Sequence, residues 1–376
     1  MKEDKNFSRR ALLKGAGIGV AYLSLENLFD AVFAKKATAA TKDLKKVKFA
    51  LAWLPQGGYA MMIAAKQLGL WEKRGLDVTV DRGFGSGRTA QSVGLGEYPY
   101  GIADFAVAVQ HIDKGLDLID FAMVAPITAA CIGVLEESNI KVPKDLEGKT
   151  IGATPGSGEH QLWPAYAKAA GIDSNKIKFS YMEASLPIPA LIEKKVDAIG
   201  TYYDTLSPQL WARDIKHRIF LYADAGLKLY SVGMITTSKR LKEEKDVVKG
   251  LAEGAMEALK MMYLEPEKVL DAHMKAVVDY EGAERNRAAV KHGMAIRTTQ
   301  GLVPYVKEKG LGWHDPEYVR ETVNIIGTYM GLKTKIDPEK AYTNEFVGNV
   351  KLTASEWKKV EENVKDYIVP KPEVKK

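Results

Sequence analysis

The sequence predicts an α/β protein made of two similar lobes, and three observations indicate this class. Short apolar runs alternate with helically spaced apolar residues from residue 46 to residue 105, and the same alternation restarts near residue 150. A mostly helical stretch follows from residue 239 to residue 330. Such alternation is typical of a largely parallel sheet flanked by helices. The chain of 376 residues is long enough for two domains of about 150 residues, each with its own core.

The first alternating region predicts three strands and two helices. Its strands are short apolar runs that end in turn residues, such as Pro55 to Gly58 after the first strand and a glycine cluster after the second. Turn residues at these places are strong signals for the end of a strand. The predicted strands are residues 46–54, 76–80 and 100–105, and the predicted helices are residues 59–70 and 89–95.

The second region repeats this order. The predicted strands are residues 150–153, 178–182 and 196–201, with helices at residues 161–170 and 185–195. Residues 92–104 and 190–204 are alike, because each runs through a helix, a short turn and a strand to an aspartate. We expect residues 121–136 to form the crossing between the lobes and residues 230–236 to form a return strand.

The return strand predicts that the first lobe is discontinuous. We expect lobe 1 to comprise residues 40–128 and 236–350, lobe 2 residues 129–235, and a C-terminal extension residues 351–376. Two connections between two lobes form a hinge with a cleft, an arrangement that closes on a ligand.

Residues 1–39 have the features of an export signal. Arg9 and Arg10 precede a glycine-rich, weakly apolar stretch, and small residues gather at residues 37–40 as a cleavage site. The stretch is shorter and richer in glycine than the roughly 20 apolar residues that span a bilayer. The arginine pair resembles a twin-arginine signal. We therefore expect the twin-arginine machinery to export a soluble mature protein, beginning near Ala40, to the periplasm.

Composition excludes several function classes. The net charge is +6, and residues 1–39 carry half of it. The charges of the remaining residues are mixed along the chain, without the basic stripe that would indicate nucleic-acid binding. The single cysteine, Cys131, excludes an internal disulfide and a cysteine-rich metal site. The six histidines match no metal motif. We expect no catalytic residues, no metal and no cofactor.

The ligand is expected where the strands end, because open α/β sheets bind ligands beyond the carboxyl ends of their strands. Aromatic residues there would stack on a flat ligand, and Asp104 and Asp204 would face one another across the cleft as acceptors. A sulfonate or nitrate would instead need donors such as Ser86, Arg88, Ser157 and the N–H groups of the helix start at residues 156–158. The candidate ligand-binding residues are Trp53, Gln56, Tyr59, Phe84, Gly85, Ser86, Asp104, Thr154, Ser157, Gly158, Tyr202, Tyr203 and Asp204.

Five segments carry a family resemblance. They are residues 51–58 (LAWLPQGG), 64–78 (AAKQLGLWEKRGLDV), 145–152 (DLEGKTIG), 195–198 (KVDA) and 342–346 (YTNEF). They resemble the periplasmic solute-binding proteins related to alkanesulfonate-, nitrate- and thiamine-pyrimidine-binding proteins, together with thiamine pyrimidine synthase. The resemblance implies a type II periplasmic-binding-protein fold, in which each lobe is a mostly parallel sheet flanked by helices and the ligand cleft lies at the hinge. It also implies delivery of a small solute to the permease and ATPase subunits of an ABC importer.

The same resemblance leaves three functions open. The YTNEF segment looks like the branch that handles the thiamine pyrimidine or its precursors, so a flat nitrogen-containing or aromatic solute is expected. Pyrimidine-binding members read Asp-Trp where this chain has Ala52 and Trp53, which keeps a sulfonate or nitrate ligand open. A pyrimidine synthase would need a lysine and a histidine where this chain has Ala103 and Val107. An enzyme is therefore not expected.

Overall fold

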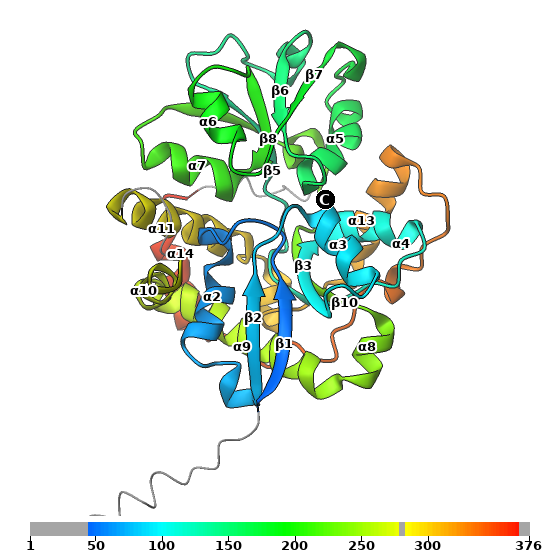
Figure 1. The fold of residues 1–376 in the computed structure, drawn as a ribbon, viewed down its shortest axis with the longest axis vertical. Helices are drawn as coiled ribbons and strands as arrows, with labels where there is room; N and C mark the ends of the chain where they lie inside the picture. Colours follow the sequence, from blue (N-terminus) through cyan, green and yellow to red (C-terminus); the bar gives the residue numbers. More distant parts are fainter. Residues whose placement is uncertain (1–43, 278–282, 368–376) are drawn as a thin grey trace, which may run out of the picture. The chain divides into compact units, whose positions relative to one another are not determined.

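The computed structural model describes residues 44–277 and 283–367, without the side chains of residues 283–285. The described residues from Lys45 onward belong to one compact unit. This unit contains two five-stranded mixed sheets flanked by helices, which confirms the predicted α/β class (Figure 1). The predicted export signal lies outside the described residues. Among the described helices, none has the length and apolar content that crossing a membrane requires.

The first sheet has the strand order β2-β1-β3-β10-β4. β1 pairs in parallel with β2 and β3, whereas β10 runs antiparallel between β3 and β4. Four strands therefore run in one direction, and the late strand β10 is inserted against them. The bounds are β1 Lys45–Ala50, β2 Leu76–Asp81, β3 Tyr100–Asp104, β4 Ile119–Met123 and β10 Val232–Thr236.

The second sheet repeats this pattern with the order β7-β6-β8-β5-β9. β6 pairs in parallel with β7 and β8, and β5 runs antiparallel between β8 and β9. One reversed strand therefore lies within each sheet. The bounds are β5 Ala130–Leu135, β6 Thr150–Ala153, β7 Lys178–Tyr181, β8 Ala198–Tyr202 and β9 His217–Leu221.

The interpretation of residues 121–136 as a plain crossing is wrong. That stretch contains the end of β4 and the whole of β5, and only residues 124–129 connect the two sheets. Apart from Asp120, both strands are buried apolar runs, so no alternation of polar and apolar residues marks them. The chain returns to the first sheet between β9, which was not predicted, and β10.

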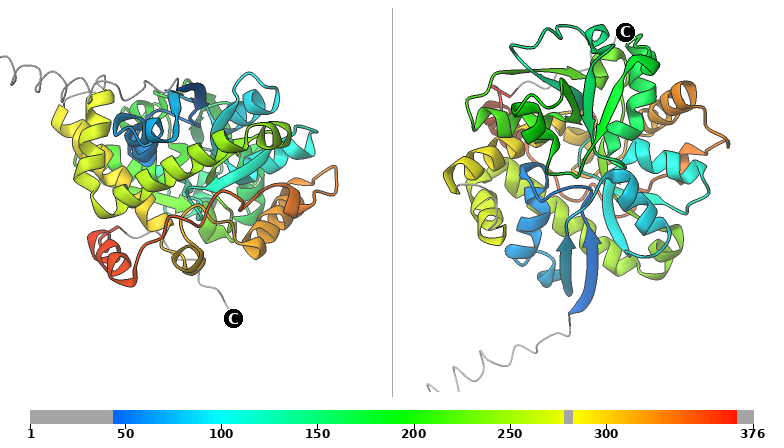
Figure 2. Two further views of the ribbon diagram at one scale, coloured as in Figure 1. Left: turned by 90° about the horizontal axis from the view of Figure 1, so that it is seen from below. Right: turned by 45° about the horizontal axis from the view of Figure 1, so that its top comes forward.

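Helices cover both sheets (Figures 1 and 2). α2 packs against α9 and α10 beside the first sheet. α11 packs along α7, which follows strand β8 of the second sheet. α13 lies against both α4, which follows β3 of the first sheet, and α5, which follows β6 of the second sheet (Figure 2). The bounds are α2 Ala60–Gln67, α3 Ser86–Gly94, α4 Phe105–Asp113, α5 Gly158–Ala169, α6 Pro187–Ile192, α7 Tyr203–Trp211, α8 Ser238–Glu243, α9 Lys245–Leu264, α10 Pro266–Ala276, α11 Ala283–Gln300, α12 Pro304–Lys309, α13 Pro316–Met330 and α14 Ala354–Asn363.

A buried polar cluster ties the C-terminal segment to β4. His314 Nε2 lies 3.0 Å from Asp120 Oδ1, and both side chains are at most 1% exposed. Asn344 brackets the backbone of His314, because its Oδ1 accepts from the His314 N–H and its Nδ2 donates to the His314 carbonyl. Asp120 also exchanges backbone hydrogen bonds with Ala341 and Thr343. The YTNEF segment is therefore a structural attachment to the first sheet.

Candidate functional site

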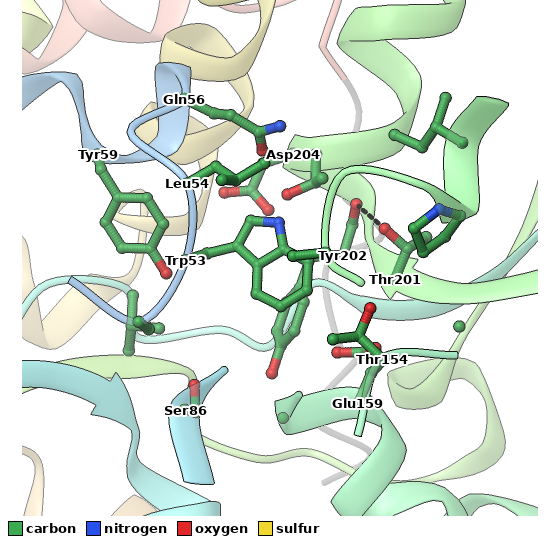
Figure 3. A pocket seen from close by; sticks show the side chains of 18 of the residues that line it. Trp53, Leu54, Gln56, Tyr59, Ser86, Thr154, Glu159, Thr201, Tyr202 and Asp204 are labelled. Carbon is green, nitrogen blue, oxygen red and sulfur yellow. Dashed lines mark hydrogen bonds between the residues drawn. The ribbon is translucent and has the colours of Figure 1, made fainter. Parts of the chain in front are cut away.

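A pocket lies where the carboxyl ends of strands from both sheets come together. Its walls come from the loop after β1, the N-termini of α3 and α5, the start of α6 and the loop before it, the end of β8, α7 and one side chain of α11. Its empty volume is about 860 Å³, including the open mouth. Figure 3 shows side chains from both sheets directed toward this space.

Aromatic side chains form much of the wall. Trp53 is half-buried and lies in the middle of the view in Figure 3, between Tyr59 and Glu159. Tyr59 is buried, and the guanidinium carbon of Arg297 lies 5.7 Å from the centre of its ring. Tyr202 lines the pocket from the end of β8. These rings offer flat apolar faces to a ligand.

Asp104 and Asp204 do not form the facing pair that the sequence suggested. Asp104 is fully buried outside the pocket lining, where its Oδ1 accepts from the backbone N–H groups of Ala106 and Val107 at the start of α4. The residue that occupies the same N-cap position in the second sheet is Tyr202, two residues before Asp204. Tyr202 Oη donates to Asp104 Oδ2 at 3.2 Å, so the two equivalent positions meet directly.

Burial also changes the acidity of Asp104. Removal from water raises its pKa to about 7, although the hydrogen bonds from Tyr202 and the backbone act in the other direction. Ser86, which lines the pocket at the start of α3, accepts a hydrogen bond from the Asp104 backbone N–H at 3.0 Å. Asp104 thus supports the floor of the pocket through its neighbours Tyr202 and Ser86.

Glu159 is an acidic group of the pocket that the sequence analysis missed. It is 4% exposed, and its Oε1 accepts from Ser157 Oγ at 2.5 Å. Burial raises the pKa of its carboxyl to about 7, and the nearby charge of Asp104 acts in the same direction. We predicted the helix to begin at Gln161, but α5 begins at Gly158, which places Glu159 in its first turn.

Arg297 and Asp204 form a buried ion pair at the opposite side of the pocket. Nη2 of Arg297 lies 2.6 Å from Oδ2 of Asp204, and the two side chains are 3% and 4% exposed. Arg297 Nε donates to the carbonyl of Gly58 at 3.1 Å, which fixes the loop after β1. A side chain at Gly58 would collide with the Asp204 carboxylate, so glycine is required there. The sequence could not reveal this pair, because 93 residues separate its members.

Three buried polar atoms that line the pocket have no hydrogen-bond partner among the described residues. They are Gln56 Oε1, Thr154 Oγ1 and Arg297 Nη1. Buried polar groups are almost always paired in a complete structure, so these atoms indicate where a ligand or water would bond. One is an acceptor, one is a donor, and the threonine hydroxyl serves as either.

Eight of the thirteen candidate residues line the pocket: Trp53, Gln56, Tyr59, Ser86, Thr154, Gly158, Tyr202 and Asp204. Four others, besides Asp104, serve other contacts. Tyr203 is a core residue that packs edge-on against Trp211. Phe84 is 47% exposed and lies under the guanidinium of Arg82. Ser157 turns toward Glu159.

Gly85, the remaining candidate, permits a contact between the two sheets rather than a contact with a ligand. Its φ of +121° lies in the region that favours glycine, and a Cβ there would collide with the Gly156 carbonyl. The neighbouring Gly87 N–H donates to the same carbonyl at 3.1 Å. The glycine-rich loops of the two sheets therefore touch each other at one side of the pocket.

In the described part of the chain, no group of three or more histidine, cysteine, aspartate or glutamate side chains is placed to hold a metal ion.

The strand order of the two sheets and the pocket between their strand ends define the type II periplasmic-binding-protein fold. The chain belongs to the family described as NMT1/THI5 like, which matches residues 56–269.

Similar proteins agree with this assignment. A protein of Brucella abortus (strain 2308) whose name describes a binding protein is 24% identical over 300 residues, which cover 77% of this chain and 88% of the relative. The formylaminopyrimidine-binding protein of Halalkalibacterium halodurans is 22% identical over 252 residues, covering 66% of this chain and 76% of the relative. The alkanesulfonate-binding protein SsuA of Xanthomonas axonopodis pv. citri, solved with MOPS, has a TM-score of 0.62 at 15% identity. That comparison covers 80% of this chain and 99% of SsuA.

Proposed function

We propose that this protein is the extracytoplasmic solute-binding component of an ABC importer, and that its solute is a small, flat nitrogen heterocycle that donates hydrogen bonds. The observation that carries the proposal is the excess of acid in an aromatic pocket. The positive charge of Arg297 is already paired with Asp204, whereas the Glu159 carboxyl has no cationic partner among the interactions of the described residues. A neutral or cationic amino group on a flat ring would satisfy Glu159 while the ring lies against Trp53.

The position of Glu159 also argues against an anionic solute. The N-terminus of a helix ordinarily attracts anions through its unpaired N–H groups. At the start of α5 the Glu159 carboxyl bonds to its own backbone N–H and to Ser157, so the protein supplies the acidic group itself. Above pH 7, where Glu159 ionises, a sulfonate placed there would meet a second buried negative charge, which is unfavourable.

A sulfonate or nitrate solute is the second candidate, because Arg297 Nη1 is a buried donor without a partner among the described residues. This group would need to bind an anion while Nη2 remains paired with Asp204. Synthesis of a pyrimidine is the third candidate and has less support. Ala103 and Val107 are both fully buried, and neither lines the pocket. We therefore propose binding without chemistry.

The remaining parts of the proposal concern transport. We propose that residues 1–39 form a twin-arginine signal, that residues 40–128 with 236–350 and residues 129–235 move as two lobes, and that residues 351–376 extend the first of them. Closure of the lobes on the solute would present a loaded form to the permease and the ATPase of the importer. Names of the relatives support a binding role, and one of them binds a formylaminopyrimidine.

The test is native mass spectrometry of protein purified without removal of bound ligand, followed by calorimetry with a defined panel. The panel contains 4-amino-5-aminomethyl-2-methylpyrimidine, its N-formyl derivative, MOPS and nitrate. We expect a pyrimidine to bind and to raise the free energy of unfolding by mass action, by about 2.7 kcal/mol at a hundredfold excess over Kd. The melting temperature should rise with it. Binding of MOPS or nitrate alone would refute the heterocycle, and conversion of a bound compound would refute the binding role.

Two aromatic variants separate the pocket from the core. Trp53→Ala should weaken binding by at least about 2 kcal/mol, because it removes a stacking face from the lining. Tyr203→Ala should instead lower the melting temperature and leave Kd nearly unchanged, because Tyr203 packs in the core against Trp211. Equal affinity of Trp53→Ala and the native protein would contradict the stacking role.

A further inference from the structure

The strand order places one end of each sheet far from the connections between the sheets. These connections join β4 to β5 and β9 to β10, whereas β2 and β7 are the first strands at the other end of each sheet. Neighbouring strands lie about 4.8 Å apart, so β2 and β7 are roughly 14 to 19 Å from the connections. A contact between the segments that follow β2 and β7 therefore has the longest lever arm against a rotation of one sheet relative to the other.

An ion pair joins the two sheets at this far end. Nη2 of Arg82, the first residue after β2, lies 3.1 Å from Oε1 of Glu183, the second residue after β7. The two side chains are 40% and 50% exposed, so salt in the solvent screens the pair. A rotation of about 15° over this lever arm would move the two segments roughly 4 to 5 Å apart, which would break the pair.

Phe84 supports the guanidinium of Arg82. The guanidinium carbon lies 4.4 Å from the centre of the Phe84 ring, a distance at which a cation is attracted to an aromatic face. Phe84 does not line the pocket, so contact with a solute does not account for this exposed aromatic side chain. The ring limits the directions that the long Arg82 side chain takes, which lowers the entropy cost of its pairing with Glu183.

Glu183 connects the ion pair to a wall of the pocket. Its Oε2 accepts from the backbone N–H of Ser185 at 2.9 Å and from Ser185 Oγ at 2.5 Å. Ser185 lines the pocket, as do its neighbours Ala184 and Pro187. The hydrogen bonds from Ser185 and the charge of Arg82 lower the pKa of Glu183 to about 2, so this carboxylate is ionised at neutral pH. One of its oxygens therefore shapes the pocket wall while the other binds the opposite sheet.

We propose that Arg82 and Glu183 form a latch that holds the two sheets in the closed arrangement, and that Phe84 is the positioning residue of this latch. The inference rests on the proposed movement of two lobes and is independent of the chemistry of the solute. Breaking the pair frees the segment after β7 to move away with its sheet, and Ser185 leaves the pocket with it. Because the pair is partly exposed and individually weak, the latch also opens again, as release of a solute requires.

Hydrogen exchange of the ligand-free protein tests the latch at a single amide. The Gly87 N–H donates to the Gly156 carbonyl, which belongs to the other sheet, so separation of the sheets exposes this amide to exchange. The Thr89 N–H donates to the Gly85 carbonyl of its own loop and reports local loosening instead. Arg82→Gln should raise the exchange rate of Gly87 about twofold to fivefold and leave the rate of Thr89 unchanged.

Glu183→Gln completes a double-mutant cycle, since glutamine still accepts from Ser185 but carries no charge. The double variant should exchange at Gly87 no faster than either single variant, because each single change already breaks the pair. High salt should raise the rate in the native protein toward that of the variants and should change the variants little.

Arg88→Gln is the matched control. It removes the same charge from the second cation near the Phe84 ring and leaves the Arg82–Glu183 pair in place, so the Gly87 amide should exchange at the native rate. Phe84→Leu should raise that rate by less than Arg82→Gln does, because it removes the aromatic face and keeps both charges. Melting curves of all variants show that each is folded.

The outcomes decide each part of the proposal. A Gly87 exchange rate that is the same in the native protein and in Arg82→Gln overturns the latch. Additive acceleration in the double variant overturns the pairing, and equal acceleration at Thr89 shows a loosened loop, which also overturns the latch. A native rate in Phe84→Leu overturns the role of the ring. No solute is present in these measurements, so failure of the pyrimidines to bind would overturn the proposed heterocycle and leave the latch standing.

Discussion

Glu159→Gln should make the ligand-free protein more stable above neutral pH, although it removes a group of the proposed binding site. The folded protein holds a proton on Glu159 up to about pH 7, whereas its ordinary pKa is 4.5. Between these values the unfolded chain has released the proton and the folded chain has not. The contribution of Glu159 to the stability of the native protein therefore falls as the pH rises from 4.5 to about 7 and is constant above that range.

The size of this effect follows from the pKa difference. One pKa unit corresponds to about 1.4 kcal/mol, so the raised pKa costs about 3 kcal/mol at pH 8. Glutamine has nearly the same shape and accepts the hydrogen bond from Ser157 without ionising. The variant should match the native protein at pH 4.5 and exceed its free energy of unfolding by about 3 kcal/mol at pH 8.

The assay is urea unfolding of the ligand-free proteins at half-unit steps from pH 4.5 to pH 8. Glu137→Gln is the control, because Glu137 is exposed and paired with Lys194 at the surface, where an ion pair contributes little. A stability difference between native and Glu159→Gln that does not change with pH would refute the reasoning. In the native protein a cationic heterocycle should bind more weakly below pH 7, as Glu159 becomes neutral, and the variant should lose this pH dependence.

Three further predictions concern other parts of the chain. Asp120→Ala should lower the free energy of unfolding by about 1 to 3 kcal/mol, because it leaves the buried His314 ring without its hydrogen-bond partner; a urea midpoint near that of the native protein would contradict this. Gly85→Ala should lower the melting temperature, because residue 85 has a φ of +121° and faces another loop; an unchanged melting temperature would show that the loops separate freely. Arg9→Lys combined with Arg10→Lys should retain the precursor in the cytoplasm, as measured by cell fractionation, and normal export would indicate a general secretory signal.

Most elements of the fold were predictable because their signals are local. β2 ends within one residue of the predicted position, before the glycine cluster, whereas β1 ends at Ala50, four residues earlier than predicted. Helical spacing gives α2, α3 and α5. The orientation of β10 was not predictable, since it depends on which strands it joins more than 100 residues earlier in the chain. β9 was missed because it is a short edge strand with a polar first half, His217-Arg218, that resembles a loop.

The part of the candidate site near strand ends was predictable from local signals, and the part that distant helices contribute was not. Trp53, Gln56 and Tyr59 lie in the segment after β1, and Tyr202 is the last residue of β8. Position near a strand end is readable from sequence. Arg297 comes from a helix far along the chain and reaches the pocket only through tertiary packing.

The YTNEF segment carries part of the family resemblance but lies away from the ligand pocket. In the described structure none of residues 342–346 lines the pocket. Asn344 instead holds the backbone of His314, and His314 bonds to Asp120 at the start of β4. Asn344 thus has a buried partner in the chain itself, whereas Glu345 pairs with Lys245 at the surface. The contacts of this segment therefore leave the solute undetermined. The chemistry of the solute depends instead on the acid at Glu159 and on the pairing of Arg297 with Asp204, which together leave the pocket with more acidic than basic groups.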